Sequence, residues 1–335
     1  MLKMTITRTL MLLLGLLLIT SVQAKTWRFA VIPKDQSNPF FQQVKIGCER
    51  AAKALGNVEC VFEGPNKANA ISQHLILEKL IDQGIDGVAF SVLLDSYVAR
   101  RTLPVLVKND IPLVTFDSDI DDSTAKRFPN VRKAYIGTNN FDLGVKLGLT
   151  LKSMRPEGGT LCIQTGRKDS VNLDERISGI RAALSVAEPK LINPARIRRL
   201  VNINGWTEHA DCPLYSWSDQ ERAVKQLQDM LTRPDNIAVV AVGGWPQYHS
   251  SYPTMMKQLK VSHPNHTLLV ADTTQEQLDL LQQGLSKINV GQKPAKMGEQ
   301  AIHTLYKIVT DQAYEPQIFT ELTHCTQDNY ARCTQ

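Results

Sequence analysis

Polar, charged and aromatic residues follow several apolar runs of this sequence at the points where the runs end. The clearest run, residues 111–116, leads directly into Asp117, Ser118 and Asp119. Such a run is typical of a strand buried on both faces of a parallel sheet, and ligands bind beyond the carboxyl ends of these strands. We therefore predict a ligand site made from residues at several strand ends: Asn38, Phe40, Phe41, Ser91, Asp117, Asp119, Arg176, Trp217, Trp245, Asp272 and Gln292.

These residue types suit a small ligand that carries many hydroxyl groups. Carboxylates accept hydrogen bonds from hydroxyls and an arginine donates to them, in charge-assisted bonds worth roughly 1.5–3 kcal/mol each. Aromatic rings cover the apolar C–H faces of a sugar ring and exclude water. The two carboxylates Asp117 and Asp119 also leave a cationic ligand open.

Each candidate also has a purely structural interpretation. Asn38 and Asp272 suit the capping of the helices that follow them, and Phe40 and Phe41 suit a helix core. Arg176 has carboxylates beside it for a surface ion pair. Asp117 has the alternative of a structural role at a buried strand end. The remaining candidates have the alternatives of a solvated loop, a lobe edge or no contact with the ligand: Asp119, Trp217, Trp245, Ser91 and Gln292.

Sequence motifs for catalysis are absent. There is no Gly-x-Ser-x-Gly, no His-Glu-x-x-His, no phosphate-binding loop and no dinucleotide fingerprint after the first strand. The seven histidines and six cysteines lack the spacing of metal ligands. The net charge of +5 is mild, and its basic residues are scattered. We therefore expect no enzyme activity, no cofactor, no metal and no nucleic-acid partner.

The first residues have the pattern of a secretory signal peptide. Lys3 and Arg8 precede an apolar run over residues 10–19, and small residues end at Ala24. The alternative is an uncleaved membrane anchor, but the run is short for a membrane span. We predict cleavage of residues 1–24 and a mature chain that begins at Lys25.

Six cysteines in an exported chain indicate disulfides, although fifteen pairings are open. Cys48 and Cys60 flank one helix-to-strand turn, and Cys325 and Cys333 lie close together in the C-terminal tail. Both pairs are plausible on spacing. The remaining two are Cys162, in a predicted buried strand, and Cys212, in a predicted loop, and spacing alone does not indicate that they pair.

Strands and helices are predicted to alternate along the chain. Apolar strand patterns cover residues 27–32, 58–62, 87–91 and 111–116, with helical patterns between them. A second series follows, with strands at residues 160–164, 200–204, 237–242, 268–271 and 288–290. Residues 119–131 read as a loop, and the last twenty or so residues as an irregular tail. This alternation predicts an α/β fold with two doubly wound parallel sheets and a cleft between them. The mature length of 335 − 24 = 311 residues also favours two lobes.

Several segments resemble the periplasmic sugar-binding proteins of ATP-driven (ABC) transporters, type I, the group that includes ribose and galactose binders. They are residues 37–41 after the first strand, 115–119 with 135–140, 175–180, 269–272 and 288–292. Their order and spacing cover essentially the whole mature chain. The resemblance implies two Rossmann-like lobes joined by a three-segment hinge. We expect residues 25–137 with 293–315 in the N-terminal lobe, residues 138–292 in the C-terminal lobe, and 316–335 as a tail that crosses back.

The resemblance also implies roles for the candidate residues. Phe40 and Phe41 would stack on a sugar ring, and Asn38 and Asp117 would bond hydroxyls from the first lobe. The second lobe and hinge would contribute Arg176, Trp217, Asp272 and Gln292. Two departures bear on the identity of the sugar: residues 243–246 read Gly-Gly-Trp-Pro where the family often has Asn, and Ser91 stands where Asn or Asp is common.

The function implied is capture of a small sugar or sugar-like polyol in the periplasm by a monomer, for delivery to a membrane permease. A sensor that signals through a histidine kinase or chemoreceptor is an alternative, as is a non-sugar ligand such as a furanose-like signal, a cyclitol or an amine. DNA-binding regulators share this fold, but the signal peptide and the absence of a helix-turn-helix before the first strand argue against that role.

Overall fold

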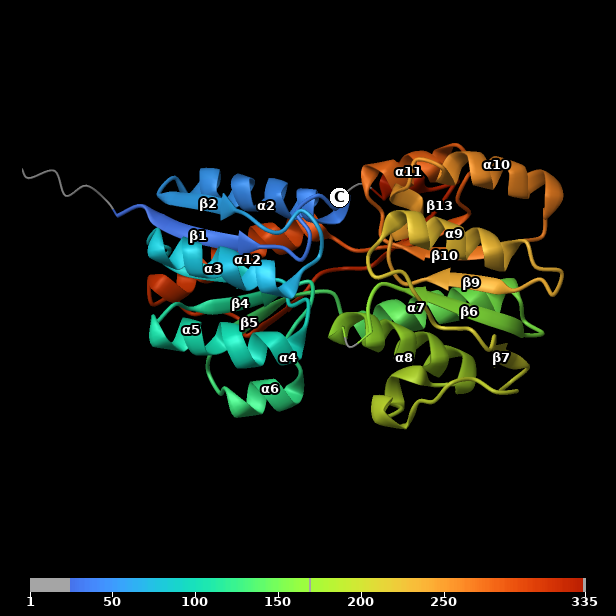
Figure 1. Ribbon diagram of the computed structural model, residues 1–335, viewed down its shortest axis with the longest axis horizontal. Helices are drawn as coiled ribbons and strands as arrows, with labels where there is room; N and C mark the ends of the chain where they lie inside the picture. The colour runs from blue at the N-terminus through green and yellow to red at the C-terminus, as the bar shows by residue number, and fades with distance from the viewer. Residues whose placement is uncertain (1–24, 169, 334–335) are drawn as a thin grey trace, which may run out of the picture.

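The computed structural model describes residues 25–168 and 170–333, and it forms two α/β lobes that lie side by side (Figure 1). The predicted signal peptide, residues 1–24, lies outside the described residues. No helix in the described ranges has the length and apolar character to cross a membrane.

The first lobe is built on a six-stranded sheet in the order β12-β5-β4-β3-β1-β2, with every pair parallel. In β1 the register places Ala30 between Val61 and Val88. The strands are β1 (Trp27–Ile32), β2 (Val58–Phe62), β3 (Gly87–Phe90), β4 (Leu113–Phe116), β5 (Arg132–Gly137) and β12 (Gln317–Phe319).

Helices cover both faces of this sheet because its strands are apolar on both sides. Phe29 and Val31 of β1 belong to one core cluster, with residues of α2 (Pro39–Leu55) and α12 (Pro294–Val309). Ala30 and Ile32 belong to the opposite cluster, with residues of α3 (Ala70–Asp82) and α5 (Leu103–Lys108). The α2 and α12 backbones meet at glycines, since a Cβ on Gly47 would overlap the Ala295 carbonyl. A helix from the C-terminal part of the chain thereby completes the first lobe (Figure 1).

The second lobe has a seven-stranded sheet in the order β13-β11-β10-β9-β6-β7, with β8 paired to β6; only β13 runs antiparallel to its neighbour. One core cluster joins this sheet to α7 (Asn140–Met154) and α8 (Val171–Ser185). The other joins it to α9 (Gln220–Leu231) and α10 (Tyr252–Ser262). The strands, with the remaining helix of this lobe, are β6 (Gly159–Thr165), β7 (Trp206–Glu208), β8 (Leu214–Tyr215), β9 (Ala238–Ala241), β10 (Thr267–Ala271), β11 (Ile288–Gly291), β13 (Thr323–Thr326) and α11 (Gln275–Gln282).

Three segments of the chain cross between the sheets. They run from β5 to α7, from β11 to α12 and from β12 to β13. The predicted fold of two Rossmann-like lobes with a three-segment hinge is confirmed. Short segments complete the chain: α4 (Asp95–Tyr97), the π-helical η1 (Val98–Thr102), α6 (Asp122–Arg127), η2 (Pro189–Leu191), η3 (Pro194–Arg196), η4 (Trp245–Tyr248) and η5 (Tyr330–Arg332).

Three local predictions were wrong. The expected loop at residues 119–131 contains α6, because Asp121 caps that helix through the Thr124 amide. The expected strand at residues 200–204 is not formed, since Asn202 and Asn204 adopt left-handed backbone angles (φ 54° and 49°) that a strand does not accept. The tail is not irregular, because β12 and β13 add one strand to each sheet.

The three cysteine pairs considered from the sequence are all disulfides. They join Cys48 to Cys60, Cys162 to Cys212 and Cys325 to Cys333. The first links α2 to β2, the second ties β6 to the loop before β8, and the third closes the C-terminal segment. Each bond therefore lies within one lobe and leaves the hinge uncrossed.

Candidate functional site

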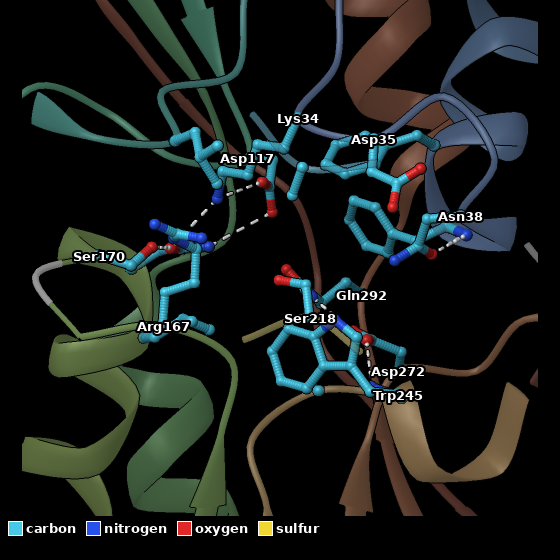
Figure 2. Close-up of a pocket in the computed structure, with 18 of the residues that line it drawn as sticks. Lys34, Asp35, Asn38, Asp117, Arg167, Ser170, Ser218, Trp245, Asp272 and Gln292 are labelled. Atoms are coloured by element: carbon cyan, nitrogen blue, oxygen red, sulfur yellow. Dashed lines mark hydrogen bonds and ion pairs between the residues drawn. The ribbon is translucent and has the colours of Figure 1, made fainter. Parts of the chain in front are cut away.

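A cavity lies between the lobes at the carboxyl ends of the parallel strands (Figure 2). Its empty space, counted together with the part that opens to solvent, is about 580 Å³. Figure 2 shows Lys34, Asp35, Asn38 and Asp117 on one side, opposite Arg167, Ser170, Trp245 and Asp272. Eight predicted site residues line it: Asn38, Phe40, Phe41, Asp117, Arg176, Trp245, Asp272 and Gln292.

Asp117 stands at the carboxyl end of β4 and is 5 % exposed. Its backbone is left-handed (φ 60°), so the chain turns and directs the carboxylate into the cavity. Oδ2 accepts a hydrogen bond from Ser91 Oγ at 2.9 Å. Asn172 Nδ2 of the second lobe lies 3.5 Å from Oδ1. Ser91 does not line the cavity; its hydroxyl instead orients the Asp117 carboxylate through this hydrogen bond.

Lys34 is a cavity residue that the sequence analysis missed. Its Nζ lies 3.0 Å from Asp117 Oδ2 and 3.3 Å from Asn172 Oδ1. Burial lowers the pKa of Lys34, and the neighbouring Asp117 carboxylate opposes that shift. The available signal was its position two residues after β1, at the edge where the other strand ends meet.

The first turn of α2 brings two aromatic rings to the cavity. Asn38 is the N-cap, and its Oδ1 accepts a hydrogen bond from Phe40 N at 2.9 Å. Phe40 and Phe41 meet edge to face at 5.2 Å, and Phe41 packs against Phe116. Both rings are 5 % exposed and belong to the core of the first lobe. Their structural role and their place in the cavity wall are therefore compatible.

Arg176 is the buried centre of a polar network in the second lobe. Nε donates to Asn140 Oδ1 at 2.9 Å, Nη1 to the Val242 carbonyl at 2.8 Å and Nη2 to Gln292 Oε1 at 3.0 Å. Its side chain is 3 % exposed, which excludes the alternative of a surface ion pair. The network connects the ends of two hinge crossings, since Asn140 begins α7 and Gln292 follows β11.

Asp272 continues this network at the carboxyl end of β10. Its Oδ1 accepts from Gln292 Nε2 at 2.6 Å and its Oδ2 from the Gly244 amide at 3.1 Å. Burial raises the pKa of Asp272, and Arg176 and these donors oppose the shift. The alternative of a helix cap does not hold, because Thr274 occupies the N-cap of α11.

Trp245 forms an aromatic part of the cavity wall in the second lobe. It begins η4, and its ring lies against two glycines. A Cβ on Gly166 or Gly243 would stand only 2.7 or 2.5 Å from ring atoms. These glycines therefore leave the space that the indole occupies. The Gly-Gly-Trp-Pro sequence at residues 243–246, where the resembled family often has Asn, thus places an aromatic ring in the cavity.

Like Ser91, the predicted residues Asp119 and Trp217 do not line this cavity. Asp119 Oδ1 accepts from Thr115 Oγ1 at 2.5 Å and lies 3.4 Å from Arg132 Nε, at a second cavity. Trp217 is 48 % exposed, since its left-handed backbone (φ 59°) turns the ring outward beside the Arg167 guanidinium. The next residue, Ser218, lines the cavity instead.

Further cavity residues also escaped the sequence analysis. Arg167 and Ser170 follow β6, and Asn172 lies in the first turn of α8. Tyr248 ends η4, and its hydroxyl donates to Gln277 Oε1 at 3.3 Å. The signal for the first three was the polar stretch after a buried strand, the same signal that identified Asp117.

Comparisons with known proteins agree with this architecture. A family model described as a periplasmic binding protein domain matches residues 29–313. The D-allose-binding periplasmic protein of Escherichia coli (strain K12) is 32% identical over 180 residues, which are 52% of this chain and 56% of that relative. The chain is thus aligned to little more than half of the length of the curated relative.

Solved structures resemble nearly the whole chain. An ABC transporter solute-binding protein from Burkholderia graminis C4D1M, in complex with D-arabinose, is 26% identical with a TM-score of 0.74, covering 93% of this chain and 99% of that one. GanP, a glucose-galactose binding protein from Geobacillus stearothermophilus, has a TM-score of 0.71 at 24% identity, over 91% and 99% of the two chains. At 24% identity, the likeness to GanP supports the fold alone.

Proposed function

The chain belongs to the periplasmic binding protein family, and from this premise we propose that it binds a small sugar or sugar-like polyol between its lobes for delivery to an ABC transporter permease. The observation that carries the proposal is the cavity in which buried polar groups of both lobes meet. The D-allose-binding relative and the complex with D-arabinose support the ligand class.

The polar groups of the cavity keep capacity for a hydroxylated ligand. Each carboxylate oxygen has two lone-pair sites, so Asp117 and Asp272 are able to accept from ligand hydroxyls beside their protein partners. The guanidinium of Arg176 has five N–H groups, and three of them donate to protein acceptors, which leaves two for a ligand. Such a site disfavours ligands without hydroxyls, because its own buried groups would then stay unpaired.

Aromatic rings of both lobes are placed to cover the apolar faces of the ligand. Phe40 and Phe41 come from the first lobe and Trp245 from the second. We propose that these three rings stack on C–H groups, while Asn38, Asp117, Arg176, Asp272 and Gln292 form the hydrogen bonds. Ser91 acts through Asp117, and Lys34 joins the first-lobe set.

Ligand binding is proposed to favour the closed arrangement of the lobes, residues 25–137 with 293–315 and residues 138–292. Asn172 of the second lobe already contacts Lys34 and Asp117 of the first. A ligand that bonds both lobes makes contacts in the closed state that the open state lacks, which shifts the equilibrium towards closure. The closed monomer is the form presented to the permease. Export with cleavage before Lys25 would place it in the periplasm, and the role requires no catalysis.

Thermal unfolding of the mature chain, residues 25–335, with a panel of monosaccharides, polyols, cyclitols and amines tests the proposal. One sugar or polyol should raise the midpoint, since binding stabilises the folded state by mass action. Calorimetric titration then gives the affinity. A flat response to all sugars and polyols would refute the ligand class, and a shift with an amine alone would assign a non-sugar ligand. Uptake in vesicles that contain the candidate permease, against activation of a sensor kinase, separates transport from signalling.

A further inference from the structure

A group of buried side-chain amides lies behind the second-lobe wall of the cavity, and the proposed function gives it no role. Its centre is Gln247 of η4, which is 4 % exposed and does not line the cavity. Its neighbours Gln277 of α11 and Asn289 of β11 are fully buried. Burying an amide is costly unless its donors and acceptors are paired, so the partners of these three residues show what the group holds in place.

The amide of Gln247 joins the other two. Its Oε1 accepts from Gln277 Nε2 at 2.7 Å and from Asn289 Nδ2 at 2.9 Å. Its Nε2 donates to Ser286 Oγ at 3.0 Å and to the Tyr252 hydroxyl at 3.3 Å. Ser286 Oγ in turn donates to Asn289 Oδ1 at 2.7 Å, which closes a ring of hydrogen bonds. Each amide of the ring therefore has one orientation that satisfies its partners.

The second N–H groups of Asn289 and Gln277 hold the backbone that carries Asp272. Asn289 Nδ2 donates to the Asp272 carbonyl at 2.9 Å, and Gln277 Nε2 donates to the Ala271 carbonyl at 3.0 Å. Asp272 has a left-handed backbone (φ 76°), a conformation that costs free energy for a residue other than glycine. Such a backbone persists only where its surroundings hold it, and these two amides, neither of which lines the cavity, supply that hold.

The same group fixes the aromatic part of the wall, which lies on the same side of the cavity (Figure 2). Trp245 and Tyr248 stand at the two ends of η4, with Gln247 between them, and both line the cavity. The Gly244 amide, just before η4, donates to Asp272 Oδ2 at 3.1 Å. Gln247 provides the second link between η4 and the Asp272 turn. The place of the Trp245 ring relative to the Asp272 carboxylate is therefore fixed at two points.

We propose that Gln247 is a positioning residue that determines which sugars the site accepts, although it touches no ligand itself. Through Asn289 and Gln277 it holds the Asp272 carboxylate where one ligand hydroxyl donates to it. The carboxylate thereby keeps a fixed place beside the Trp245 ring. Epimers differ only in the direction of one hydroxyl, so discrimination between them requires an acceptor that does not move to follow that hydroxyl. The inference rests on the proposed binding of a sugar or polyol in this cavity.

Calorimetric titration of the mature chain with a set of epimers tests the inference. The probes are D-glucose, its epimers D-mannose, D-allose and D-galactose, the pentoses D-ribose and D-arabinose, and the polyols formed by their reduction. Gln247→Met keeps the length of the side chain without its amide. It should weaken the tightest-bound probe about tenfold, as for one lost hydrogen bond, and the other probes less than about threefold, so that selectivity shrinks. Gln228→Met, at an exposed amide on α9, is the matched control and should leave every affinity unchanged.

A double-variant cycle tests whether Gln247 acts through Asp272. In the Asp272→Asn background the tightest-bound probe is already weakened, and Gln247→Met should then add less than about a further twofold. Gln247→Glu is the conservative variant. Burial favours the neutral carboxyl, which both donates and accepts, so this variant should restore the selectivity that Gln247→Met loses.

NMR titration of the Asp272 carboxyl in the sugar-free protein is a readout that does not depend on a ligand. In the wild type, burial raises the pKa of Asp272 and the Asp117 charge adds to this shift, whereas Arg176 and the hydrogen bonds from Gln292 and Gly244 oppose it. In Gln247→Met the carboxyl should gain access to water, and its pKa should fall towards the ordinary value of an aspartate.

Three results would each overturn the inference. They are equal weakening of every probe by Gln247→Met, a loss in the Asp272→Asn background as large as in the wild type, and an unchanged pKa of Asp272 in Gln247→Met. If the wild type binds none of the sugars and polyols, the proposed function fails and this inference fails with it. Wild-type binding with the same selectivity in Gln247→Met refutes the inference alone.

Discussion

Lys34 and Asp117, which follow the carboxyl ends of β1 and β4, form an ion pair with Nζ 3.0 Å from Oδ2. Their side chains are only 12% and 7% exposed. Ser91 holds the same carboxylate oxygen from β3's end, and Asn172 reaches the pair from the other lobe. The pair therefore belongs both to the stability of the first lobe and to the contact between lobes.

Replacing Asp117 separates these two roles. Asp117→Ala leaves the Lys34 ammonium buried without its partner, and we expect the free energy of unfolding to fall by about 3 kcal/mol. Ligand affinity should weaken by about 2 kcal/mol or more, because a buried acceptor is lost. The double variant Lys34→Met/Asp117→Ala should regain much of the stability in urea unfolding without regaining affinity. An unchanged unfolding free energy in Asp117→Ala would show that water already solvates the pair.

Arg176→Lys should disable the site although the positive charge is kept. An ammonium cannot supply the planar fork that reaches Asn140, Val242 and Gln292 together. Ligand affinity should fall at least about tenfold, since the donors that organise Gln292 and Asp272 are lost. The matched control is Arg222→Lys on the exposed side of α9. If calorimetry finds the same ligand affinity for Arg176→Lys as for the wild type, the proposed role of this hydrogen-bond network in binding is contradicted.

The two tryptophans at the cleft should behave differently. Trp245→Ala removes a ring that lines the cavity and should weaken ligand binding about tenfold through lost apolar contact. Trp217→Ala removes an exposed ring and should leave affinity nearly unchanged. Titration of each variant with the ligand found in the panel measures this. The opposite ranking would mean that the ligand-bound state turns Trp217 inward.

The disulfides should contribute unequally to stability. Cys162 and Cys212 are 50 positions apart and Cys325 and Cys333 only 8. The chain-entropy argument gives about 4 kcal/mol for the longer loop and about 2.5 kcal/mol for the shorter one. Denaturant unfolding of the paired Cys→Ala variants should follow this order. Native protein with six reactive thiols would refute the bonds themselves.

Glu175 should make stability depend on pH. More than a third of Glu175 is exposed, yet desolvation of its carboxyl raises its pKa to about 7. The charges of Asp119 and Asp122 add to this shift, whereas the Arg176 charge and the hydrogen bond with Asn140 oppose it. Because the pKa of Glu175 is higher in the folded state than the unfolded value of 4.5, the stability that Glu175 adds in its protonated form is fully present below pH 4.5. This stability is lost as the pH rises through about 7.

The measurement is urea unfolding at about pH 5 and about pH 8. The wild type should lose more stability between these values than Glu175→Gln, by a modest amount because solvent screens an exposed group. Identical pH profiles of the two proteins would contradict the raised pKa.

The alternation of apolar strands and amphipathic helices determined the fold class from local chemistry. Residues 111–116 are apolar except for Thr115, so they had to lie inside a sheet, and Asp117 had to lie at its edge. Arg176, Asp272 and Gln292 follow from the same reasoning with the family resemblance. These residues line one cavity because the carboxyl ends of parallel strands meet on one side.

Only the tertiary structure decided which side chains turn inward. Trp217 and Ser218 both have left-handed backbones, and this turn sends the indole out and the serine in, which residue type cannot reveal. Asp119 has the same chemistry as Asp117, yet Arg132 of β5 holds it at the second cavity. Lys34 belongs to a residue type that is rarely buried, and only the ion pair with a residue 83 positions away (117 − 34 = 83) explains its place. Contacts between distant segments set side-chain direction, whereas the sequence pattern reports only local periodicity.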